Sequence, residues 1–92
     1  MDAGADFNAV TESNVTPIYL AAKSGSVGSL ELLIEKGADI NGLNDLSGST
    51  PLMAAAKYGH IEAIKYLYKK GADTNILNKN DETALIIAVK AS

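Results

Sequence analysis

The sequence predicts an all-α solenoid of antiparallel helix pairs, with hairpin loops that project to one side. Residues 16–41 align without a gap with residues 50–75. The threonine that opens each block returns at Thr83, so the period is 33 residues with one residue inserted between 41 and 50. Each block also holds two apolar stretches at helical spacing, separated by a glycine. A fixed period of roughly 20–50 residues is the sequence signature of a repeat architecture.

The inner helix of each pair has a clear start and end. Thr-Pro at 16–17 and 50–51 places a capping hydroxyl before a proline at the first helical position. Gly25 and Gly59 allow a sharp turn, because glycine adopts positive φ without a steric penalty. We expect helices over 16–24, 27–36, 50–58, 60–70 and 83–91, the last without an outer partner.

Apolar residues recur at helical spacing in both outer helices, and this pattern predicts that they face the core. They are Val27, Leu30, Leu33 and Ile34 in the first helix and Ile61, Ile64, Leu67 and Tyr68 in the second. The inner helices are rich in alanine, whose small side chain lets neighbouring inner helices approach closely. We therefore expect a concave surface along the inner helices.

The 33-residue period, the Thr-Pro starts and the Gly-Ala-Asp motifs at 37–39 and 71–73 resemble the ankyrin repeat. The resemblance covers the whole chain and implies a single ankyrin-repeat domain. Its parts would be the tail of a preceding repeat at 1–10, a first repeat at 11–43, a second repeat with the inserted residue at 44–77, and a partial repeat at 78–92.

Both ends lie within a repeat, and the last helix exposes an apolar face in this arrangement. We expect Leu85, Ile86, Ile87 and Val89 to be partly exposed. The chain is therefore expected to be a fragment of a longer array, or a short protein that self-associates through this helix.

The family usually has histidine at the fourth position of its Thr-Pro-Leu-His motif, where the ring ties neighbouring repeats together. Here that position holds Tyr19, Met53 and Ile86. We expect apolar packing to replace those hydrogen bonds.

Composition argues against several classes of function. The chain has no cysteine, a net charge of −3, and only lysine among its eight basic residues. Disulfides and thiolate metal sites are therefore excluded, and a nucleic-acid partner is not expected without arginine. Lys57, Lys65, Lys69 and Lys70 form a basic cluster that is either a solvated helix face or a contact for an acidic protein. We expect no membrane span and an intracellular, cytoplasmic location.

No residue pattern predicts catalysis or cofactor binding. His60 is the only histidine and occupies the position that starts an outer helix, so we expect a structural role and neither a metal site nor a catalytic triad. The glycine-rich segment 24–29 lacks the preceding strand and the lysine of a phosphate-binding loop. We expect no enzyme activity, no cofactor and no metal.

The ankyrin resemblance implies that a partner protein binds hairpin tips and exposed inner-helix positions. Tyr58 is the strongest candidate, because an exposed tyrosine gives a large contact area with little entropy loss. For each position the alternative is plain solvated surface. The candidates are Lys23 and Ser24, Leu46, Ser47 and Ser49, Lys57 and Tyr58, and Lys79 and Asn80, with Glu82 beside the last two.

The sequence therefore predicts a protein-protein interaction module that binds its partner through the concave surface. Two alternatives stay open: a structural spacer or self-associating element, and the accessory ankyrin region of a larger enzyme or channel.

Overall fold

The computed structural model describes residues 16–42 and 48–91, and within these ranges every regular element is a helix. The helices are α1 (Pro17–Ser24), α2 (Val27–Glu35), α3 (Pro51–Lys57), α4 (Ile61–Lys69) and α5 (Ala84–Ala91). Their bounds lie within one residue of those expected from the sequence. The predicted all-α class is confirmed.

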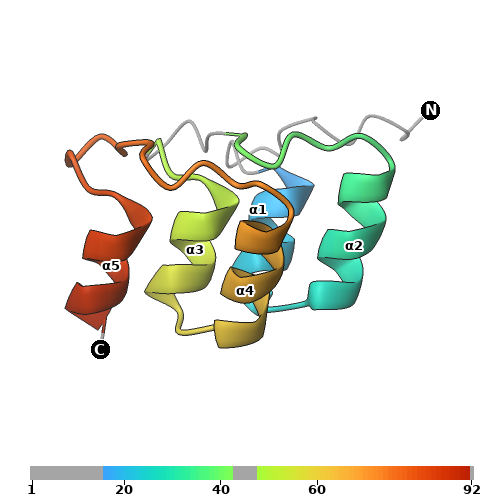
Figure 1. The fold of residues 1–92 in the computed structure, drawn as a ribbon, viewed down its shortest axis with the longest axis horizontal. Helices are drawn as coiled ribbons and strands as arrows, with labels where there is room; N and C mark the ends of the chain where they lie inside the picture. The colour runs from blue at the N-terminus through green and yellow to red at the C-terminus, as the bar shows by residue number, and fades with distance from the viewer. Residues whose placement is uncertain (1–15, 43–47, 92) are drawn as a thin grey trace.

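The helices stand side by side, with the short turns of the α1–α2 and α3–α4 pairs at one edge and the inter-repeat segments at the other (Figure 1). The inner helix α3 packs closely against both α1 and α5, whereas the outer helices α2 and α4 make few mutual contacts. Closer packing of the inner helices than of the outer ones favours curvature toward the inner helices, and we call the side that they line the concave side.

Side-chain caps fix where the helices begin. The hydroxyl of Thr16 accepts a hydrogen bond from the Tyr19 N–H, and that of Thr50 accepts one from the Met53 N–H, each at 3.2 Å. Ser26 caps α2 in the same way, whereas His60, at the equivalent position before α4, makes no side-chain cap. The turns after α1 and α3 use Gly25 and Gly59 with φ near +70°, as the sequence predicted.

The core lies between the inner and outer layers. Its largest fully buried apolar side chains are Ile18, Leu30, Met53 and Leu67, and small residues such as Ala22 and Ala55 fill the space between helices.

The outer-helix expectation was wrong at two positions: Ile61 is 58% exposed and Tyr68 is 68% exposed. The face of α4 that meets α3 runs through Ala63 and Leu67, which lie one helical turn apart and are both buried. At about 100° per residue, Ile61 and Tyr68 fall outside that narrow stripe.

Apolar packing replaces the family histidine only in part. Met53 is buried, but its sulfur also accepts a hydrogen bond from the Thr50 N–H at 3.4 Å. Tyr19 is half-buried, and Ile86 is exposed because no described residue covers that face of α5. Apolar packing therefore does not replace the histidine at Ile86, whereas the expected partial exposure of this residue is confirmed.

Candidate interaction surface

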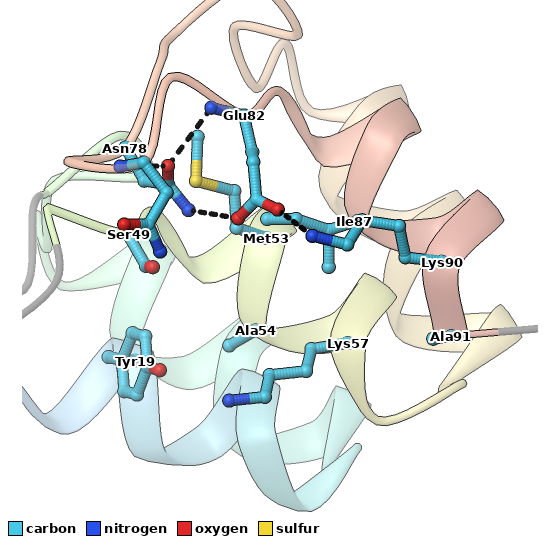
Figure 2. Close-up of a pocket in the computed structure, with 11 residues that line it drawn as sticks. Tyr19, Ser49, Met53, Ala54, Lys57, Asn78, Glu82, Ile87, Lys90 and Ala91 are labelled. Carbon is cyan, nitrogen blue, oxygen red and sulfur yellow. Dashed lines mark hydrogen bonds and ion pairs between the residues drawn. The ribbon is translucent and has the colours of Figure 1, made fainter.

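A groove runs between the inner helices and the loop that precedes α5 (Figure 2). Its volume is about 460 Å³, in the range of about 300–1,000 Å³ that ligand sites occupy. Tyr19, Met53, Ala54 and Ile87 supply apolar surface, while Ser49 and the loop residues Asn78, Asn80 and Glu82 form the opposite wall. Lys57, Lys90 and Ala91 complete the lining from the helix side. An apolar floor with polar margins suits a peptide-like ligand.

Asn78 organises the loop wall. Its side-chain oxygen accepts hydrogen bonds from the N–H groups of Asn80 and Glu82, at 2.8 and 3.0 Å. Its backbone N–H donates to the Glu82 carbonyl, and its amide group donates to the Glu82 carboxylate at 3.0 Å. Asp81 completes this tight turn with φ of 59°, a left-handed conformation that short polar residues tolerate. The buried Asn78 side chain thus holds the loop in one shape.

The Glu82 carboxylate has two partners, Asn78 on the same loop and Lys90 on α5. Its second oxygen accepts from the Lys90 ammonium group, so loop and α5 are joined. The hydrogen bond from Lys90 and then that from Asn78 lower the pKa of Glu82 below its ordinary value. The carboxylate therefore stays ionised near neutral pH and neutralises Lys90.

Tyr58 lies just after the last turn of α3 and is 44% exposed. The ammonium nitrogens of Lys23 and Lys57 each lie 5.6 Å from the centre of its ring. Cations at this distance from an aromatic face are attracted to it by about 0.5–1 kcal/mol at exposed sites. Neither lysine forms an ion pair with a carboxylate of the described residues. We call Lys23, Lys57 and Tyr58 the aromatic–lysine cluster.

Tyr19 links the aromatic–lysine cluster to the groove. Its side chain is half-buried in the wall formed by α1. Burial raises the pKa of Tyr19, and the nearby Tyr58 adds to this effect. The phenol therefore stays neutral in the physiological range and acts as a hydrogen-bonding, largely apolar surface.

The structure brings several predicted site residues together and leaves others apart. Lys23, Lys57 and Tyr58 form one cluster, and Ser49 and Asn80 line the adjoining groove. Ser49 is buried, however, so it offers little surface to a partner.

Two further candidates, Ser24 and Lys79, do not line the groove. Ser24 is exposed at the end of α1, and Lys79 is exposed beside Gly48. Leu46 and Ser47 lie outside the described residues.

Sequence reasoning missed Tyr19, Asn78 and Lys90 as lining residues. Lys90 had a usable signal, because Lys23, Lys57 and Lys90 occupy the same position of successive repeats. Asn78 had a weaker one, the Asn-x-Asn-Asp sequence that is typical of side-chain-stabilised turns.

His60 connects the two repeats beneath the aromatic–lysine cluster. Its Nε2 lies 2.8 Å from the Lys23 carbonyl oxygen. Because a carbonyl oxygen only accepts, Nε2 carries the proton and donates. A second inter-repeat bond runs from the Asp73 N–H to the Asn41 side-chain oxygen at 2.8 Å.

Residues 16–42 and 48–91 contain no group of three or more His, Cys, Asp or Glu side chains that could hold a metal ion. Their helices are all too short or too polar to cross a bilayer.

The family is settled by comparison with known proteins. The model for "Ankyrin repeats (3 copies)" matches residues 1–78 and 41–92, which together span the chain. The chain belongs to the ankyrin-repeat family, whose members are generally protein-interaction modules. A search of curated proteins found no match.

Proposed function

We propose that this chain recognises a protein partner through the concave side of its inner helices, with Tyr58 at the centre of the contact. The observation that carries the proposal is the aromatic–lysine cluster: an exposed tyrosine whose ring is flanked by two ammonium groups without carboxylate partners among the described residues. Tyrosine is enriched among the residues that dominate binding energy at protein interfaces. Beside the cluster, the groove adds apolar surface and the fixed polar wall of Asn78.

The proposal includes no catalysis and no cofactor. The only histidine donates to a backbone carbonyl, and the Glu82 carboxylate is paired with Lys90 and Asn78. Both groups are thus held by hydrogen bonds within the fold. We propose an intracellular, cytoplasmic setting, in keeping with a chain that has no cysteine.

Site-specific photo-cross-linking tests the proposal with a matched control. A photoreactive phenylalanine analogue replaces Tyr58 in one variant and Tyr68 in the other, since both tyrosines are exposed but Tyr68 lies on the outer helix α4. Each variant is irradiated in lysate of the source organism. We expect a discrete adduct at 58 that is absent at 68 and is competed away by unmodified chain. An adduct that forms only at 68 would place the interface on the convex side and refute the proposal.

Self-association is a second candidate function, favoured by the exposure of α5. Leu85 is 74% exposed and Val89 is 65% exposed. Burying two such side chains between copies stabilises by about 1.5–3 kcal/mol each. Sedimentation equilibrium would favour this function if mass rises with concentration and if Leu85→Ser with Val89→Ser abolishes the rise.

A further inference from the structure

We infer that the partner segment is an acidic, extended peptide whose carboxylate binds the aromatic–lysine cluster and whose following residues enter the groove. This inference rests on the proposed function and adds the chemistry of the ligand. It is carried by how charge is distributed along the inner helices.

The lysines at the ends of the three inner helices differ in whether a carboxylate forms an ion pair with them. Lys90 is neutralised by Glu82, which also accepts from Asn78. Lys23 and Lys57 have no carboxylate partner among the described residues, although the whole chain has a net charge of −3. Among the described residues, Lys90 is thus held in an ion pair, whereas Lys23 and Lys57 are not, although Lys57 acts on the Glu82 carboxylate at longer range.

The helix ends do not cancel this charge. Each of the ends of α1 and α3 carries a partial charge of about −0.5, so two ammonium groups leave a local charge of about +1. The Lys23 carbonyl at the end of α1 is moreover engaged by His60. The local field therefore favours an anion.

Tyr58 and its surroundings favour a carboxylate on a peptide over a bare ion. Both ammonium groups lie 5.6 Å from the centre of the ring. Next to it the groove offers the apolar surface of Tyr19 and Ile87 and the polar group of Asn80. A side-chain carboxylate at the cluster would leave the neighbouring residues of its peptide in contact with that surface.

The length of this surface sets the length of the peptide. Inner helices pack about 8–10 Å apart, so α1 to α5 spans about 20 Å, which about six extended residues cover at 3.3 Å each. A nucleic acid is less suited, because the chain has no arginine and, among the described residues, this surface presents only Lys23 and Lys57 as lysines without an ion pair.

A selection from a random nonapeptide display library against the immobilised full chain tests the inference. Recovered peptides are synthesised, and their affinities are measured by fluorescence polarisation. We expect enrichment in Asp and Glu and weaker binding at higher salt. In the Lys23→Gln, Lys57→Gln variant we expect about a tenfold loss of affinity, because losing each exposed charge pair lowers affinity about threefold. The control is Lys65→Gln with Lys69→Gln on α4, which removes the same charge and should change affinity less than about twofold.

The outcomes separate this inference from the proposed function. The selected peptides could lack acidic enrichment and lose binding with Tyr58→Ala but not with the Lys23→Gln, Lys57→Gln variant. That result would overturn the acidic chemistry of the ligand but leave the proposal of binding through the concave surface standing. Peptides unaffected by either variant, or recovery of no peptide, would count against both. Tighter binding of a labelled oligothymidine probe, lost in the lysine variant, would overturn the peptide in favour of nucleic acid. Circular dichroism establishes that each variant is folded.

Discussion

The imidazole of His60 lies over Gly25 and donates from Nε2 to the carbonyl oxygen of Lys23, at 2.8 Å. The two bonded residues are 37 positions apart in the sequence and belong to adjacent repeats. A histidine at the start of an outer helix thus ties two repeats together in a chain that lacks the family's usual histidine on the inner helix. The same bond fixes the backbone that carries Lys23, and hence one side of the aromatic–lysine cluster.

Loss of this bridge should destabilise the fold modestly. We expect His60→Ala to lower the free energy of unfolding by about 1 kcal/mol, the usual net value of one hydrogen bond. His60→Ser removes the bridge but supplies a capping hydroxyl like that of Ser26, so its cost should be smaller. Urea denaturation followed by circular dichroism measures both. A His60→Ser variant less stable than His60→Ala would contradict the capping argument.

Gly25 and Gly59 form a matched pair that separates backbone strain from steric contact. Both have φ near +70°, but a Cβ at Gly25 would lie 2.6 Å from Nδ1 of His60, whereas one at Gly59 meets nothing within 4 Å. Gly59→Ala should cost about 1–2 kcal/mol from the left-handed conformation alone. Gly25→Ala should cost about 1 kcal/mol more, because the ring must move and lose its bond to Lys23.

A double-mutant cycle checks the origin of that difference. In the His60→Ala background, Gly25→Ala and Gly59→Ala should have equal costs in thermal or urea unfolding, because the contact is gone. A difference that persists in this background would show that His60 is not its cause.

The hairpin bond between repeats can be tested at Asn41. Its side-chain oxygen accepts from the Asp73 N–H at 2.8 Å, so Asn41→Ala should destabilise the chain by about 1 kcal/mol. Asn75 occupies the equivalent position one period later and is exposed. Asn75→Ala serves as the control and should stay within about 0.5 kcal/mol of the parent chain. Equal losses in the two variants would argue against a specific bridge.

The lowered pKa of Glu82 predicts how the stability of the fold depends on pH. Its pKa is lowered in the folded chain, first by the Lys90 hydrogen bond and then by that of Asn78. A group with a lowered folded pKa stabilises above its unfolded pKa, and this contribution is lost as the pH falls through the folded pKa. Glu82→Gln should therefore shift the urea midpoint downward at pH 7 and much less at pH 3. The exposed Glu62→Gln variant controls for general charge effects, and a shift that grows in acid would refute this assignment.

Much of the fold follows from local sequence. Thr-Pro at 16–17 and 50–51 and the glycines at 25 and 59 act within a few residues of themselves, so the helix bounds were predicted closely. Burial was predicted less well. Ile61 and Tyr68 match a helical stripe in the sequence, yet the stripe that α3 covers is narrower and passes through Ala63 and Leu67.

The candidate site divides in the same way. The position of each residue within its repeat was enough to predict that Lys57 and Tyr58 lie on the concave side and that Lys23 is the equivalent of Lys57. Lys57 is the chain neighbour of Tyr58, and the packing of α1 against α3 brings the Lys23 ammonium group to the same ring, so that each lies 5.6 Å from its centre. The pairing of Lys90 with Glu82 likewise depends on the shape of the loop that Asn78 holds.

The sequence by itself determined the repeat, the class of fold and the ends of the helices. These properties depend on a period and on contacts within one or two turns, which can be counted along the chain. The tertiary structure decided which residues act together: His60 with Lys23 across 37 positions, Asn41 with Asp73 across 32, and Tyr58 between two lysines. Such pairs depend on how far one repeat turns and shifts against the next, which follows from the packing of all side chains between them.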